Sequence, residues 1–102
     1  MKMLEFCPVQ HEEAFAERTP EGLIVMAPNG QLYRFNGLAD FIWNRLNGHT
    51  SVQEIIDAIV AQYQVPSVEQ VTSDVIQFIA FLREKALIRQ EEGEEGADWP
   101  GS

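Results

Sequence analysis

Few residues in this chain of 102 could carry out chemistry on a substrate. His11 and His49 are the only histidines, one in the leading segment and one next to an expected helix start. We interpret His49 as a solvated turn residue rather than a general base. The sequence has no glycine-rich phosphate loop and no nucleophile elbow. We therefore predict that the protein is not an enzyme and needs neither a cofactor nor a metal.

A different chemistry is the capture of an extended peptide, which needs an unpaired strand. Residues 31–36 alternate, with Tyr33 and Phe35 on one face and Leu32 and Arg34 on the other. This period of two predicts a short strand. In a sheet of two or three strands, at least one strand is an edge whose N–H and C=O groups are free to pair.

An apolar surface is expected on a helix that Ser67 caps and that extends to about Lys85. Its main stripe consists of apolar residues at helical spacing: Val68, Val71, Val75, Phe78, Ile79 and Leu82. Phe81 falls outside this stripe, which indicates a second apolar surface beside the helix. Asp74 lies just off the stripe, where it is either an exposed helical acid or a polar contact in a groove. Basic residues at the end, such as Lys85, are favourable near a helix C-terminus.

The strands that must position these residues are expected before any helix. Residues 14–18 are a weak strand candidate, and residues 19–22 have the composition of a turn. Residues 23–26 form a short apolar run that is typical of a buried strand. Residues 28–30, Pro-Asn-Gly, then reverse the chain into the alternating strand at 31–36.

Three helices are expected to follow, joined by short loops. Asn36 is predicted to cap the first helix, which runs to about residue 47 and stops at Gly48. Ser51 and Glu54 have the spacing of a capping box, which starts the second helix. Its apolar stripe continues to Tyr63, and the following proline ends it. This order predicts an α+β fold that resembles a winged helix with the strands placed before the helices.

The composition restricts the partners. The net charge is −9, but five acids and no bases lie in residues 90–102, so the rest of the chain has 11 acids against 7 bases. Such a balance argues against binding to a phosphate backbone. Cys7 is the only cysteine, which excludes an intrachain disulfide and a cysteine-rich metal site. With no visible signal peptide and no apolar stretch of about 18 residues, we expect a cytoplasmic protein without a membrane partner.

The chain divides into three parts. Residues 1–13 are expected to form an N-terminal arm in which Phe6 packs on the domain. Residues 14–89 form the folded domain. Residues 90–102 are clustered acids and glycines that cannot bury enough surface to order, so we predict a disordered acidic tail. Trp99 is the one large apolar residue in that tail.

Five segments resemble a known family in their order and spacing. They are Tyr-Arg-Phe-Asn at 33–36, Phe-Ile-Trp at 41–43, Gly-His-Thr-Ser-Val-Gln-Glu-Ile at 48–55, Asp-Val at 74–75 and Phe-Ile-Ala-Phe-Leu at 78–82. Together they resemble the PqqD family, small domains also called RiPP recognition elements, over about residues 14–89. The chain departs from the family at Ala86, where a glycine is common, and at Phe35, where a leucine is usual.

The resemblance implies a three-stranded antiparallel sheet followed by three helices, without catalytic activity. Such domains bind the leader segment of a ribosomally made precursor peptide and present the precursor to a modifying enzyme, often a radical SAM enzyme or, in lasso-peptide systems, a leader protease. The leader adds as a strand to the third strand and lies in a groove against the third helix. The implied peptide-binding residues are Gln31, Leu32, Tyr33, Arg34 and Phe35 on the strand, and Asp74, Val75, Phe78, Phe81, Leu82 and Lys85 on the helix.

Two alternatives remain open at this point. A winged-helix DNA-binding regulator would use the third helix for recognition, but residues 67–82 contain no Lys or Arg and include the acids Glu69 and Asp74. A small subunit that completes the active site of another protein is the second alternative. The protein is expected to be a monomer or a homodimer, in which elements could be exchanged between the copies.

Overall fold

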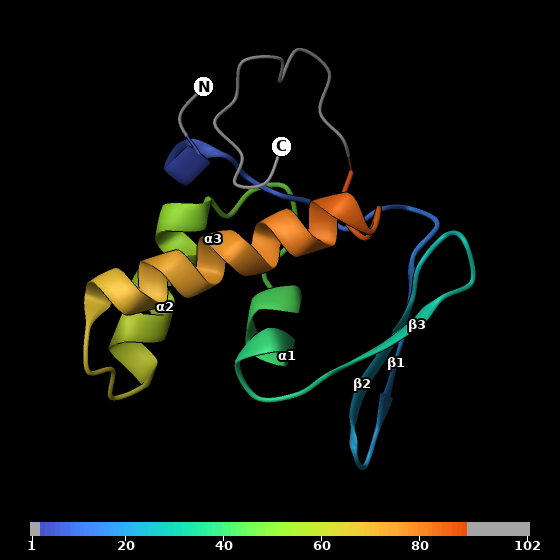
Figure 1. The fold of residues 1–102 in the computed structure, drawn as a ribbon, viewed down its shortest axis with the longest axis horizontal. Helices are drawn as coiled ribbons and strands as arrows, with labels where there is room; N and C mark the ends of the chain where they lie inside the picture. Colours follow the sequence, from blue (N-terminus) through green and yellow to red (C-terminus); the bar gives the residue numbers. More distant parts are fainter. Residues whose placement is uncertain (1–2, 90–102) are drawn as a thin grey trace.

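Three strands precede three α-helices along the chain, and the α+β prediction is confirmed (Figure 1). The structure is a computed structural model that describes residues 3–89. The elements are η1 (Met3–Glu5), β1 (Phe15–Thr19), β2 (Gly22–Met26), β3 (Leu32–Phe35), α1 (Leu38–Trp43), α2 (Val52–Gln62) and α3 (Val68–Glu84). The predicted acidic tail, with Trp99, lies outside the described residues. Among those residues, no helix combines the length and the apolar character that a membrane crossing needs.

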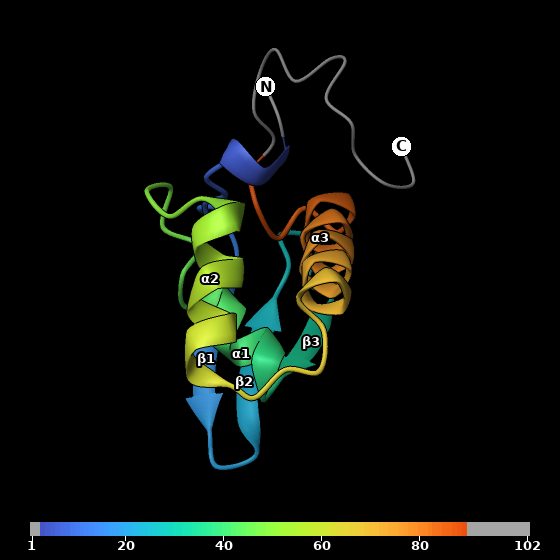
Figure 2. The same ribbon diagram turned by 90° about the vertical axis from the view of Figure 1, so that its left-hand side faces the viewer.

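The sheet is antiparallel in the order β1-β2-β3, so β2 is its central strand. Leu23, Val25 and Phe35 are buried on one face, because residues two apart on a strand point to the same side. The helices cover that face, with α2 towards β1 and α3 towards β3 (Figure 2). The opposite face of the sheet is not covered by any described element, and it carries the exposed side chains of Phe15, Met26 and Leu32.

Side-chain caps fix the starts of the two long helices, as predicted. The Ser51 hydroxyl accepts from the Glu54 N–H (3.1 Å), and the Glu54 carboxylate accepts from the Ser51 N–H (2.8 Å). This capping box satisfies two backbone donors that have no partner inside α2. The Ser67 hydroxyl accepts from the Gln70 N–H (3.2 Å) at the start of α3. Both caps depend on residues within one helical turn, which explains why the sequence predicts them.

The prediction for the first helix is wrong at both ends. Its N-cap is Gly37, which has φ 58° and no side-chain bond, and not Asn36. The helix ends at Trp43, because the amides that follow its cap residue Asn44 bond three residues back rather than four: Arg45 N–H donates to the carbonyl of Ile42 (2.9 Å). Gly48 is therefore not the helix stop. Its N–H donates to the carbonyl of Pro8 in the N-terminal segment (2.9 Å).

The predicted apolar stripes of α2 and α3 extend too far at one end each. Tyr63 follows α2 as its C-cap and is 40% exposed, with its ring edge-on to that of Phe41 at 5.4 Å. Val68 lies in the first turn of α3 and is 53% exposed. Both residues lie at helix ends that extend past the core. Helical spacing predicts the face of the helix on which they lie, but it does not predict that they are exposed there.

The N-terminal segment packs onto the domain. Phe6 is buried, and its carbonyl accepts from the Val52 N–H at the start of α2 (2.8 Å). Further along, His11 N–H donates to the carbonyl of Leu87 (2.9 Å), and Gln10 forms an isolated antiparallel bridge with Ile88. Leu87 and Ile88 are fully buried, so the residues after α3 both pack on the core and pair with the N-terminal segment.

Ala86 ends α3 in a left-handed conformation, with φ 60°. Its N–H donates to the carbonyl of Arg83 (3.2 Å), and the N–H of Leu87 donates to the carbonyl of Leu82 (2.9 Å). These two bonds are those of a Schellman motif, in which the left-handed position usually holds glycine. The conformation gives a physical reason why the family commonly has glycine where this chain has Ala86.

Candidate functional site

The outer edge of β3 is unpaired within the part of the chain that the structure describes. β3 pairs with β2 on one side, and no strand among residues 3–89 pairs with its other side. A free edge presents N–H and C=O groups in the spacing that an extended peptide matches. The edge of β3 can therefore accept an additional strand.

The turn before β3 shows which backbone groups face this free edge. The Ala27 N–H donates to the carbonyl of Gln31 (2.8 Å), so these opposing residues form a hydrogen-bonded pair at the start of the ladder. Hydrogen-bonded and non-hydrogen-bonded pairs alternate in an antiparallel sheet. In the observed register, Tyr33 therefore bonds to β2. The N–H and C=O groups of Leu32 and Arg34 point away from β2 and form the free edge.

Four aromatic rings join β3 to α3. Phe35 contacts Phe78 edge-on with ring centroids 5.3 Å apart, and Tyr33 contacts Phe81 edge-on at 5.6 Å. Phe78 and Phe81 stack along the helix at 6.3 Å. Pairs of this kind add about 0.5–1.5 kcal/mol each beyond the area that they bury. The rings therefore hold the strand against the helix and place an apolar surface beside the free edge.

The helix residues predicted for the site separate into two rows. Asp74, Phe78, Phe81 and Lys85 are spaced by four, three and four residues, so they follow one side of α3. Asp74 is exposed, and the other three are partly exposed. Val75 and Leu82, also predicted for the site, are fully buried. A peptide on the surface would touch the first row, while the second row supports it from the core.

The strand residues predicted for the site take different positions. Gln31 precedes β3 and accepts a hydrogen bond from the Tyr33 hydroxyl (3.2 Å). Phe35 is 5% exposed, so its ring supports the surface from below. Leu32 is 63% exposed, and Arg34 is exposed too; both side chains lie on the face of the sheet opposite the rings. Leu32 and Arg34 thus offer their backbone, and not their side chains, to an added strand.

Opposite charges stand at the two ends of the surface row on α3. Asp74 lies at the end nearest the N-terminus of α3, and its carboxylate accepts from the Gln70 side-chain amide (2.9 Å). Lys85 lies at the other end, with its Nζ 6.0 Å from the centroid of the Phe81 ring and 3.8 Å from the Glu84 carboxylate. An extended ligand over the rings would meet an acid at one end and a base at the other.

The second edge of the sheet, on β1, lacks such a surface. Four of the five β1 residues are exposed, and none of them takes part in the aromatic contacts described above. Arg18 instead joins β1 to α1 through two hydrogen bonds to the Asp40 carboxylate, at 2.7 and 2.9 Å. The hydrogen bond from Arg18 lowers the pKa of Asp40; desolvation opposes this effect, and a hydrogen bond from Asn44 adds a smaller lowering contribution. β1 therefore offers an edge but not the aromatic contacts that lie beside β3.

The two histidines, which are the residues most able to act in catalysis, take part in hydrogen bonds within their own short segments. His11 Nδ1 accepts from the Glu13 N–H (3.0 Å), and the His49 N–H donates to the Asn47 side-chain oxygen (2.8 Å). Within residues 3–89, no three or more His, Cys, Asp or Glu side chains are grouped so that they could hold a metal ion. The chemistry that the described residues favour is the binding of a peptide strand.

Comparisons with known proteins agree with this fold. The family model described as coenzyme PQQ synthesis protein D (PqqD) matches residues 21–88. The solved structure "TbiB1 in Complex with the TbiA(beta) Leader Peptide" is similar with a TM-score of 0.73 and 21% identity, over 81% of this chain and 96% of that one. "Lasso peptide synthetase B1 complexed with the leader peptide" is similar with a TM-score of 0.74 and 18% identity, over 82% and 99%. No curated protein sequence matches the chain.

Proposed function

The chain belongs to the PqqD family, and from this we propose that it is a non-catalytic recognition domain for the leader segment of a ribosomally made precursor peptide. The observation that carries the proposal is the free edge of β3 beside the rings of Tyr33, Phe78 and Phe81. The titles of two similar structures name leader-peptide complexes, which supports this choice of ligand.

The leader pairs with β3 as a fourth strand. The N–H and C=O groups of Leu32 and Arg34 supply up to four backbone hydrogen bonds, each with a net contribution of about 0.5–1.5 kcal/mol. Leader side chains on the helix side of the new strand lie over Phe78 and Phe81, where full burial of each contributes about 1.5–3 kcal/mol. The backbone bonds hold any extended peptide, so the ring surface and its flanking charges select the leader.

The orientation of β3 predicts the polarity of the leader sequence. Tyr33 contacts Phe81 and Phe35 contacts Phe78, so β3 runs opposite to α3. An antiparallel leader strand, the more stable pairing, therefore begins near Asp74 and ends near Lys85. Lys85 is eleven positions after Asp74, a rise of about 16 Å along the helix, which matches about five residues of strand. The preferred leader has a basic residue near its start, apolar side chains on the face towards Phe78 and Phe81, and an acidic residue near its end.

The bound leader leaves the rest of the precursor available to a modifying enzyme in RiPP or PQQ-type biosynthesis. A radical SAM enzyme or a leader protease is the partner that we propose, and the encounter takes place in the cytoplasm, where the precursor is made. α3 is poorly suited to DNA binding, because it has Glu69 and Asp74 and no base before Arg83.

The experiment is a titration followed by NMR. The ligand is a synthetic peptide with the leader sequence of a short precursor encoded beside this gene, and the protein is the full chain labelled with ¹⁵N. We expect the largest amide shifts at residues 31–36 and along the surface row of α3. Shifts confined to β1 or to α2 would refute the proposed site.

A charge reversal tests the predicted polarity. Lys85→Glu should weaken a leader whose acidic residue faces position 85, and it should favour the same peptide with that acid changed to lysine. Arg89→Glu is the matched control, because Arg89 is an exposed base that follows α3 and lies outside the surface row. An equal loss in both variants would show that only net charge matters and would contradict the proposed orientation.

A further inference from the structure

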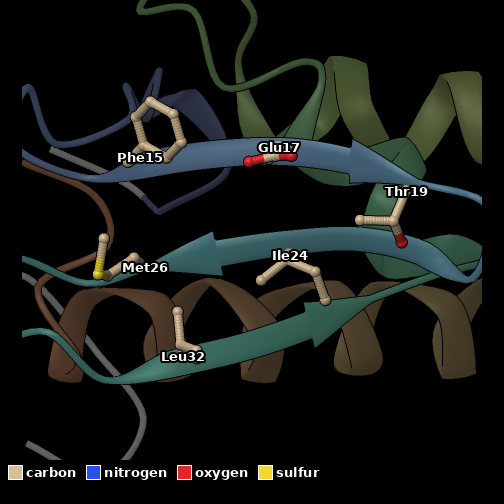
Figure 3. A pocket seen from close by; sticks show the side chains of 6 residues that line it. All are labelled: Phe15, Glu17, Thr19, Ile24, Met26 and Leu32. Atoms are coloured by element: carbon tan, nitrogen blue, oxygen red, sulfur yellow. The ribbon is translucent and has the colours of Figure 1, made fainter.

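The face of the sheet opposite the helices carries exposed apolar side chains. Figure 3 shows Phe15, Met26 and Leu32 side by side, one from each strand. They are 59%, 38% and 63% exposed, although large apolar side chains are usually sheltered. With Ile24 they line a shallow depression of about 260 Å³ that also includes Glu17 and Thr19. This surface, the outer face, lies apart from the rings beside α3.

An acid and a base lie on opposite sides of Ile24 on the outer face. Glu17 pairs with Ile24, and Ile24 pairs with Arg34, so these three side chains form one row across the sheet. The acid is on one edge strand and the base is on the other. Arg34 is 3.9 Å from the Glu21 carboxylate, but both side chains are more than half exposed, and such a pair contributes little. Arg34 is therefore available for a better partner.

We propose that the outer face binds the outer face of a second copy of this chain, around a two-fold axis parallel to the strands. This axis places β1 of one copy over β3 of the other and β2 over β2. Glu17 then faces Arg34 of the second copy, and the same contact repeats with the roles exchanged, as a two-fold interface requires. Phe15 likewise faces Leu32, and Met26 faces Met26. The surface is thus complementary to itself in charge and in apolar character.

The charges disfavour the other face-to-face arrangement. A two-fold axis that crosses the strands would place β1 over β1 and β3 over β3. Glu17 would then stand near Glu17 and Arg34 near Arg34, and like charges in a partly desolvated interface are repulsive. The favoured arrangement keeps the strands of the two sheets nearly aligned, which is a common packing of sheets about 10 Å apart.

The size of the outer face predicts a reversible dimer. Three strands of four or five residues offer less surface than the roughly 800 Å² per partner of a standard stable interface. Association should therefore depend on concentration. Because the contact uses the face of the sheet, the edge of β3 stays free in both copies, and this inference does not depend on peptide binding.

Sedimentation velocity on the full chain, from low micromolar to low millimolar, tests the proposal. We expect a monomer–dimer equilibrium. Glu17→Arg and Arg34→Glu should each weaken the dimer by about tenfold, because each creates two like-charge contacts. A one-to-one mixture of the two variants should restore the wild-type dissociation constant, since every contact in the mixed dimer again joins opposite charges. Phe15→Gln should weaken the dimer without a change of charge.

Asp57→Arg on α2 is the matched control, since it makes the same charge change at an exposed position away from the outer face. It should leave the dimer within about twofold of the wild type. A protein that stays monomeric at all concentrations would overturn the proposal, and the outer face would then be a site for a different protein, such as the modifying enzyme. A mixture that fails to restore the dimer would overturn it as well.

Discussion

A proline at position 32 tests whether the backbone of β3 binds the leader. Leu32 is the first residue of β3, its N–H points away from β2, and its side chain is on the outer face. Proline is tolerated at such a position, because no hydrogen bond inside the sheet is lost. Leu32→Pro removes one of the four donors and acceptors on the free edge, and it leaves a leader carbonyl without a donor. An unpaired group of this kind costs about 1–3 kcal/mol, which is about a 5- to 150-fold increase in Kd.

Leu32→Ala is the matched control, because it removes the same side chain and keeps the N–H. We expect its Kd for the leader to stay within about threefold of the wild type. The assay is isothermal titration calorimetry at low micromolar protein, with thermal unfolding to confirm that both variants are folded. Equal Kd values for Leu32→Pro and Leu32→Ala would refute strand addition at this edge, even if the leader still binds elsewhere.

Three further predictions concern stability. Ala86→Gly should raise the free energy of unfolding by about 0.5–1 kcal/mol, because glycine adopts the left-handed conformation freely. Ala80→Gly inside α3 is the control and should lower it by about 1 kcal/mol. Urea unfolding distinguishes the two signs, and a loss of stability in both variants would contradict the left-handed conformation of Ala86. Arg18→Gln should be less stable than the wild type near neutral pH. Since the pKa of Asp40 is lowered in the folded state, this difference should persist down to the unfolded-state pKa of about 3.9 and disappear as the pH falls through the folded-state value; a constant difference at all pH values would contradict it. Ser51→Ala should cost about 1 kcal/mol through loss of the α2 cap, measured by thermal unfolding, and an unchanged midpoint would show that the cap is dispensable.

The sequence predicts those features that depend on residues close along the chain. The caps at Ser51 and Ser67 are complete within three residues, and the alternation of Tyr33 and Phe35 requires only the pleat of one strand. The family resemblance in turn predicts that β3 and α3 belong together, and the ring contacts between them agree with it.

Other features depend on contacts between distant segments and could not be read from a local pattern. Asn36 has the right type for a cap, but the chain turns at Gly37, and α1 is cut short where residues 45–48 leave the helix to meet the N-terminal segment. The family resemblance implied one site that includes both Val75 and Phe81, but packing against the core buries Val75 and leaves Phe81 partly exposed. The outer face was missed because Phe15 stands alone in a weak strand and joins Met26 only through the register of the sheet.

The alternation of β3 allows one short strand to serve two surfaces. At Leu32 and Arg34 the backbone faces the free edge while the side chains face outward from the sheet, and at Tyr33 the backbone pairs with β2 while the ring meets α3. A change that affects only the side chain at 32 or 34 should therefore act on self-association, and a change to the backbone there should act on the leader. If the two activities cannot be separated in this way, the edge and the outer face do not bind independently, and the two proposals would have to be replaced by a single site.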